Sequence, residues 1–151
     1  MAKTFQVAKT LCSLSDWKMT NLSLQKLLYL AHMYYLGTYQ QPLIDGHFEA
    51  WNFGPVEPEL YHKVKAYGNG PIVDVFPCPS LDSTSDEYKA VVAVYNQLKD
   101  IPSAMLVSIT HQECGAWAQC YRPNVRGIVI QNEEIRNEYI RRTQGTTSAS
   151  V

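Results

Sequence analysis

NLSLQKLLYLAHMYYL, residues 21–36, is the stretch that decides the fold. It leaves almost no polar face, yet it is too short to cross a bilayer. A helix that is apolar on nearly every side must be wrapped by other helices, so we predict a central buried helix over residues 22–36. Lys26 and His32 are the only ionisable residues inside it, and each therefore needs a partner or a path to water.

Further helices are predicted wherever apolar residues recur at helical spacing. Thr20 or Asn21 is the expected N-cap of the central helix, and Gly37 is its expected end. The other predicted helices span residues 4–15, 59–67, 104–110, 114–121 and 133–142, with one more running from a cap within 82–85 to residue 101. Short strands are predicted near residues 47–51, 72–76 and 128–130. The predicted fold is mostly α, a single compact helical domain around the central buried helix.

The composition is that of one globular domain. The chain has 151 residues, of which 46% are hydrophobic and 18% charged, and this length can bury a sizeable core. Residues 143–151 are small, polar and aperiodic. We therefore expect residues 1–142 to form the domain and residues 143–151 to be a disordered tail.

The net charge and the cysteine spacing argue against nucleic-acid binding, membrane binding and a disulfide framework. A formal net charge of -1 gives no electrostatic footprint for binding DNA, RNA or an anionic membrane. The N-terminus lacks the apolar core and cleavage site of a signal peptide, which indicates a cytoplasmic protein. The 4 cysteines are spaced irregularly and form no C-x-x-C pair, so we interpret them as reduced thiols.

His111, Glu113 and Cys114 place an imidazole, a carboxylate and a thiol close together in the sequence, as a thiol- or metal-dependent hydrolase would need. However, residues adjacent in sequence seldom point at one atom, and a zinc site of His111, Cys114 and Cys120 lacks a fourth ligand. The motifs of serine hydrolases, phosphate-binding loops and paired catalytic carboxylates are absent. We therefore expect no catalytic residue, no cofactor and no metal, and we interpret His111, Glu113 and Trp117 as a structural corner.

The run WNFGPVEP, residues 51–58, has two interpretations. It is a recognition surface if its aromatic residues are exposed, because Trp and Tyr dominate binding hot spots. Alternatively, Trp51 and Phe53 fill the core while glycine and proline fix a tight strand-to-helix turn, and we favour this second interpretation for the apolar residues. Glu57 precedes Pro58 at an expected helix N-terminus, where the helix dipole favours a carboxylate.

Four stretches form one pattern: LQKLLYLA at 24–31, FEAW-x-x-GPV-x-PELY at 48–61, Tyr67-Gly68, and TH-x-E at 110–113 with Trp117. Together they resemble one known family, the Panacea domain of SocA-like antitoxins and of phage-associated proteins once called GepA. The resemblance runs in order over nearly the whole chain. One difference is Ala116, because the family usually has proline before this tryptophan, and the local turn is therefore in question.

The resemblance implies a non-enzymatic antitoxin that holds an unrelated toxin protein, encoded by an adjacent gene, in an inactive complex. For SocA itself the family picture includes delivery of the toxin to a AAA+ protease, so a role as proteolytic adaptor stays open. Two alternatives remain. A phage-associated regulatory protein would need a basic face, and the sequence shows no cluster of basic residues that would form one. A hydrolase would need His111, Glu113 and Cys114 to converge in a cleft.

The residues that match the family motif are interpreted as mainly structural. They are Lys26, Tyr29, Trp51, Gly54, Pro55, Pro58, Tyr61, His111, Glu113 and Trp117. Contacts with the toxin are expected from exposed positions in residues 51–61 and 69–76. The candidate partner-binding residues are Phe53, Glu57, Glu59 and Asp74.

Overall fold

The computed structural model describes the backbone of residues 2–150 and the side chains of residues 3–144. Over that part of the chain, seven α-helices and one short 3-10 helix (η1) accompany a small three-stranded sheet, which confirms the predicted mostly α-helical fold. The elements in chain order are α1 Ala2–Leu14, α2 Asn21–Tyr39, β1 Phe48–Trp51, β2 Gly54–Val56, α3 Pro58–Val64, η1 Lys65–Tyr67, α4 Asp86–Leu98, α5 Ser103–Thr110, α6 Ala116–Cys120, β3 Val129–Ile130 and α7 Asn132–Ser150.

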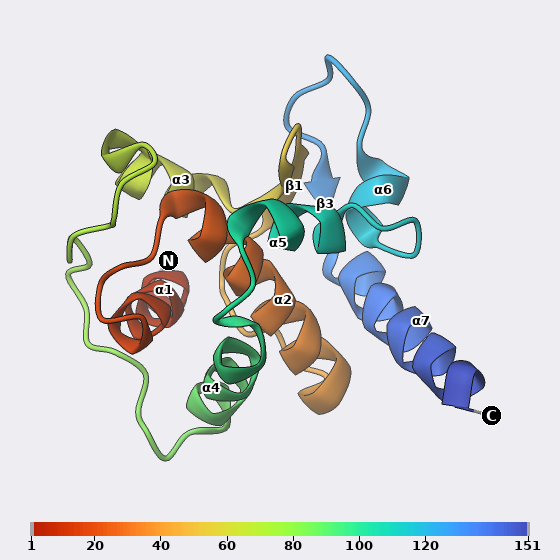
Figure 1. The fold of residues 1–151 in the computed structure, drawn as a ribbon, viewed down its shortest axis with the longest axis horizontal. Coiled ribbons are helices and arrows are strands. Elements are labelled where there is room, and N and C mark those ends of the chain that lie inside the picture. The colour runs from red at the N-terminus through yellow and green to blue at the C-terminus, as the bar shows by residue number, and fades with distance from the viewer. Residues whose placement is uncertain (1, 151) are drawn as a thin grey trace.

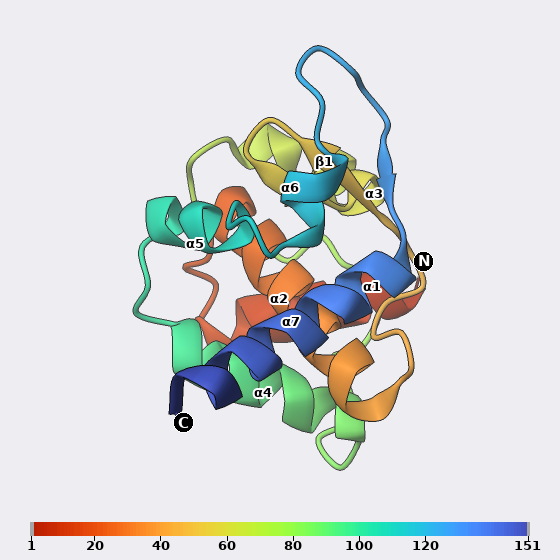
Figure 2. The same cartoon turned by 90° about the vertical axis from the view of Figure 1, so that its right-hand side faces the viewer.

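Helix α2 runs through the middle of the molecule, and α1, α4, α5 and α7 pack around it (Figures 1 and 2). Every side chain from Leu24 to Leu36 except Tyr34 is buried. Thr20 is the N-cap, and its hydroxyl oxygen accepts a hydrogen bond from the Ser23 backbone N–H at 3.4 Å. The prediction of a central helix wrapped by other helices is confirmed.

The C-terminal end of α2 corrects a prediction. The helix continues past Gly37 and is capped by Gln40, whose φ of 60° lies in the left-handed region. A Cβ added at Gly37 would collide with the ring of Tyr139 on α7. The glycine therefore allows α7 to approach α2 closely and does not end the helix.

The sheet has the order β2-β1-β3 and is antiparallel throughout. Strands predicted near residues 47–51 and 128–130 are confirmed by β1 and β3. Strand β2 was predicted as a turn because glycine and proline are rare inside strands. It lies at the edge of the sheet and has only one neighbouring strand. Pro55, which has no N–H to donate, is therefore tolerated opposite Ala50.

The strand predicted at residues 72–76 is wrong. This segment has no strand partner in the described chain. One backbone hydrogen bond and the packing of one ring hold it instead. The Ile72 backbone N–H donates to the Met19 carbonyl at 2.9 Å, and the buried Phe76 ring packs against Phe5 and Trp17. The side chains of Ile72 and Phe76 therefore anchor this segment to the core in place of strand pairing.

The starts of two helices follow different rules. Pro58 opens α3 as predicted, and the Glu57 carboxylate caps it by accepting the Glu59 N–H at 2.8 Å. Ser103, which we expected to cap the helix at 104–110, is instead the first residue of α5, and Pro102 occupies the cap position. Pro102 makes no side-chain cap hydrogen bond.

Helix α7 continues to Ser150, beyond Arg142, where the sequence places its end. The division into a domain of residues 1–142 and a tail of residues 143–151 stays a prediction, and Val151 lies outside the described residues. None of the helices in the described chain combines the length and apolar character needed to cross a membrane.

Candidate functional site

Two neighbouring polar side chains of α2 hold the turn between β2 and α3. The Gln25 amide pairs twice with the main chain of Glu57: its Nε2 donates to the Glu57 carbonyl at 3.1 Å, and its Oε1 accepts the Glu57 N–H at 2.8 Å. Next to it, the Lys26 Nζ donates to the Pro55 carbonyl at 2.8 Å. Both side chains are buried. The buried lysine has therefore found its partner in a backbone carbonyl.

Lys26 and Gly54 form one packing unit. Burial lowers the pKa of the Lys26 ammonium group to about 7. Gly54 has a φ of 112°, and a Cβ added there would lie 2.9 Å from the Thr110 Oγ1 and 3.0 Å from the Lys26 Cε. Both the backbone conformation and the space therefore exclude a side chain at position 54.

A column of aromatic rings holds the β1–β2 hairpin from the α5–α6 end. The His111 ring stacks on Trp117 with centroids 3.7 Å apart, and Trp117 stacks on Tyr121 at 4.6 Å. The Trp117 Nε1 donates to the Trp51 carbonyl at 2.7 Å, and the Tyr121 hydroxyl donates to the Asn52 Oδ1 at 2.8 Å. The stacked rings and the two hydrogen bonds therefore connect the α5–α6 end of the chain to the hairpin.

Trp51 and Tyr61 complete the support of the hairpin. Their rings meet edge to face with centroids 4.8 Å apart, which ties β1 to α3. The Trp51 Nε1 donates to the Glu49 Oε1 at 3.0 Å, so the polar edge of this half-buried indole is satisfied. The motif residues of the hairpin thus contact one another and are packed as a group.

Phe53 lies at the tip of the hairpin, and its side chain is exposed to solvent. Its side chain is 64% exposed, more than any other large apolar side chain in the described part of the protein. The residue before it, Asn52, is bonded to Tyr121, and the residue after it is the locked Gly54. Sequence analysis favoured a core position for Phe53, and the structure corrects this. A rigidly presented aromatic ring loses little conformational entropy on binding.

The other candidate partner-binding residues differ in how accessible they are. Glu59 is exposed on the first turn of α3, close in sequence to the hairpin. Glu57 is 0% exposed and burial raises the pKa of its carboxyl group, so it is unavailable to a partner. Its Oε2 caps α3, whereas its buried Oε1 has no hydrogen-bond partner within the described residues. Asp74 is exposed, but its Oδ2 lies 3.2 Å from the Lys9 Nζ.

Tyr29 is bonded to a residue that sequence analysis missed. Its hydroxyl donates to the Glu138 Oε1 on α7 at 2.6 Å, and the same oxygen accepts the Ala116 N–H at 3.0 Å. The Arg142 Nε donates to the other carboxylate oxygen at 2.8 Å. Glu138 is 0% exposed, yet no local pattern separates it from the exposed acids of the same helix. Gln25 did carry a signal, as a polar residue beside Lys26 in an apolar helix.

His111, Glu113 and Cys114 do not converge. The His111 ring faces Trp117, Glu113 is exposed, and the Cys114 carbonyl accepts a hydrogen bond from the Arg141 Nε at 2.8 Å. Burial, together with the Lys26 ammonium, lowers the pKa of His111, opposed by the backbone carbonyl of Phe53. Among the described residues, no three His, Cys, Asp or Glu side chains are placed to hold a metal ion. The arrangement gives no support to a thiol- or metal-dependent hydrolase.

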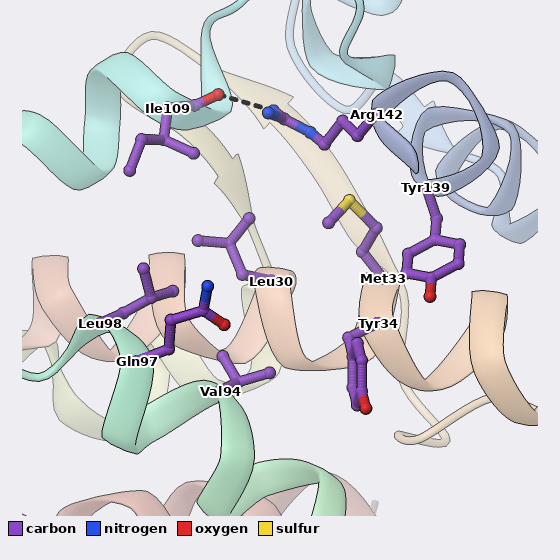
Figure 3. Close-up of a pocket in the computed structure, with 9 residues that line it drawn as sticks. All are labelled: Leu30, Met33, Tyr34, Val94, Gln97, Leu98, Ile109, Tyr139 and Arg142. Carbon is purple, nitrogen blue, oxygen red and sulfur yellow. Dashed lines mark hydrogen bonds between the residues drawn. The ribbon is translucent and has the colours of Figure 1, made fainter. Parts of the chain in front are cut away.

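An apolar pocket of about 190 Å³ lies elsewhere, between α2, α4, α5 and α7 (Figure 3). Leu30 and Met33 of α2 line it together with Leu98 of α4 and Tyr139 of α7. At its edge, an Nη of Arg142 donates to the Ile109 carbonyl at 2.8 Å. The pocket contains none of the sequence-predicted site residues and is therefore separate from the hairpin.

Two comparisons with known proteins found matches to this chain. The family model "Antitoxin SocA-like, Panacea domain" matches residues 24–118. "Antitoxin SocA" of Caulobacter vibrioides (strain NA1000 / CB15N) is 32% identical over 114 residues, which cover 68% of this chain and 60% of that protein. This chain therefore spans less than two thirds of the length of that relative. No solved structure matches this chain.

The family match includes most of α2, the β1–β2 hairpin, His111 and Trp117. Lys26, Gly54 and Trp117, three of the residues by which the sequence resembled the family, contact one another or the hairpin backbone. The chain belongs to the SocA-like antitoxin family defined by the Panacea domain.

Proposed function

We propose that this protein is an antitoxin that neutralises a cognate toxin protein, encoded by an adjacent gene, by direct binding. The observation that carries the proposal is the presentation of Phe53. An exposed aromatic ring stands on a hairpin that four side chains, Gln25, Lys26, Trp117 and Tyr121, hold through hydrogen bonds. Preorganised aromatic anchors of this kind are typical binding hot spots. The family relationship supports the same function.

The proposed contact surface is centred on Phe53, with Glu59 on its flank. The Phe53 ring would insert into an apolar pocket of the toxin, and Glu59 would meet a polar rim. Asp74 is proposed as a weaker, peripheral contact because its charge is already paired with Lys9. Binding through this surface needs no chemical change in the toxin.

Co-expression and mass spectrometry test the function. This protein, co-expressed with the product of the adjacent gene, should restore growth, and the purified pair should co-elute. The toxin released from the complex by denaturation should keep its mass and recover its activity after refolding. A toxin of altered mass would mean that this protein acts as a modifying enzyme. Absence of a complex between the two proteins would refute the proposal.

A proteolytic-adaptor role is the finer form of the proposal. If the complex delivers the toxin to a AAA+ protease, co-expression of this protein should shorten the half-life of the toxin in cells. The shortening should disappear in a strain that lacks the protease. An unchanged half-life with full rescue of growth would leave neutralisation by binding and exclude the adaptor role.

Alanine substitution tests the surface. Phe53→Ala should weaken toxin binding by about 2 kcal/mol or more, or roughly 30-fold in Kd, because it removes the proposed anchor. Its melting temperature should stay close to that of the wild-type protein, since the side chain is mostly exposed. Met105→Ala, at a 55% exposed methionine on α5, is the matched control and should bind normally. Equal Kd values for wild type and Phe53→Ala would place the interface elsewhere.

A further inference from the structure

The chain between α6 and the start of β3 stands out from the body of the protein. We define residues 121–129 as the arm, which comprises this loop and Val129, the first residue of β3; the loop projects beyond the helices in both views (Figures 1 and 2). At its start the Tyr121 hydroxyl is bonded to Asn52, and near its end the Ile128 carbonyl accepts the Ala50 N–H at 2.9 Å. Both ends of the arm are therefore tied to the hairpin that carries Phe53.

The arm has a defined shape and an apolar surface. Asn124 and Gly127 have φ values of 65° and 75°, so the loop turns through two left-handed positions. Val125 is 50% exposed and Val129 is 38% exposed. Together with Phe53, these account for three of the seven exposed large apolar side chains in the described chain. Exposed apolar side chains thus occur both at the tip of the hairpin and on the arm that is bonded to it.

The charge of the arm has one sign. Arg122 and Arg126 are both exposed, and neither forms an ion pair within the part of the protein that the structure describes. The Arg122 guanidinium donates only to backbone carbonyls, at 2.8 Å and 3.2 Å. From Gly115 to Asn132 the sequence contains no Asp or Glu. Two arginines without acidic partners thus flank the exposed Val125.

We infer that the arm forms the second half of the toxin-binding surface and that it receives an apolar patch of the toxin edged by Asp or Glu carboxylates. Arginine forms bidentate hydrogen bonds with carboxylates, and Val125 and Val129 would cover the apolar centre. The inference rests on the proposed function and names the chemistry of the partner. The arm begins after residue 118, where the match to the family model ends, so it belongs to a part of the chain that the family description does not cover.

Charge reversal tests the arm. Arg126→Glu should lower the association rate constant with the product of the adjacent gene by about tenfold at low salt, because charged groups at an interface steer the encounter. It should also weaken the salt dependence of that rate. Lys99→Glu makes the same charge change at an exposed residue that directly follows α4, outside both the hairpin and the arm. This control should change the rate less than about twofold.

The outcomes separate the two proposals. A wild-type protein that does not bind would refute the proposed function, and the inference about the arm with it. If the wild type binds, Phe53→Ala weakens binding, and Arg126→Glu behaves like Lys99→Glu, then the arm is not part of the surface and the proposed function stands. Val125→Ser gives a second measurement: it should raise the dissociation rate constant several-fold, and an unchanged rate would also contradict the inference.

Discussion

The β1–β2 hairpin and the segment of residues 71–81 are both anchored to the helices, but the structure holds them in different ways. Contacts with the toxin were expected from residues 51–61 and 69–76, which overlap these two regions. In the hairpin, polar side chains from other elements bond the main chain, as Lys26 does at Pro55. In the segment, the buried side chains of Ile72 and Phe76 are themselves the anchors.

The two kinds of anchoring leave different surfaces. Support through the main chain frees the side chain at the hairpin tip, so Phe53 is displayed at 64% exposure. In the segment, the aromatic side chain is itself the anchor: Phe76 is 4% exposed and packs on Trp17, so its ring is not accessible to a partner. The segment still exposes Val73, at 59%. The hairpin therefore keeps an aromatic side chain free for the proposed contact, because other elements hold its backbone.

The largest expected effect comes from the two left-handed glycines, one in the hairpin and one before the segment. Gly54→Ala should lower the free energy of unfolding by about 2–5 kcal/mol, since it combines a strained φ of 112° with contacts to Thr110 and Lys26. Gly68→Ala would place alanine at a φ of 56° and a ψ of -125°, but with open space around the new Cβ, so backbone strain alone should cost about 1–3 kcal/mol. Chemical unfolding measures both values, and equal losses would contradict the packing unit around Gly54.

The next effect is the pH dependence contributed by Lys26. Its pKa is about 7 in the folded protein and near 10.5 when unfolded, so above pH 7 the unfolded state binds the extra proton. The free energy of unfolding should therefore rise with pH in this window, by up to about 1.4 kcal/mol for each pH unit, relative to Lys26→Met. Both proteins carry the same cysteines, so the difference between their profiles from about pH 7 to 8.5 cancels the cysteine titration. Parallel pH profiles would show that Lys26 is not a buried, destabilised ammonium group.

The smallest effect is expected in the segment. Asp74→Ala removes the pair with Lys9 and the hydrogen bond from the Phe76 N–H, both at 3.2 Å. Since the carboxylate is 44% exposed, the loss of stability should stay below about 1 kcal/mol. Toxin binding should weaken only slightly, less than for Phe53→Ala. A stronger binding defect in Asp74→Ala would make the segment the main contact surface.

The sequence predicted well what local periodicity determines. The apolar character of residues 22–36 placed the central helix, and Pro58 placed the start of α3. The family resemblance identified Lys26, Gly54 and Trp117 before their contacts were visible. In the structure these residues meet at one hairpin, as a motif with mainly structural roles would require.

Contacts between distant parts of the chain could not be predicted. The Glu138 carboxylate is bonded to Tyr29, 109 residues away, so nothing near it in sequence marks it as buried. Gly37 was predicted as a helix end because the sequence does not show that Tyr139 packs against it. Glu57 was expected to be accessible because carboxylates are rarely buried, but here it caps α3 and its backbone is held by Gln25.

Hydrogen–deuterium exchange of this protein, alone and in complex with the toxin, compares the two regions directly. The central claim is that the rigid hairpin, and not the 71–81 segment, is the main contact with the toxin. Complex formation should slow exchange most at residues 52–54 and within the 121–129 arm, and only slightly at residues 71–81. Strong protection of residues 71–81, with unchanged exchange at the hairpin and arm, would contradict the account.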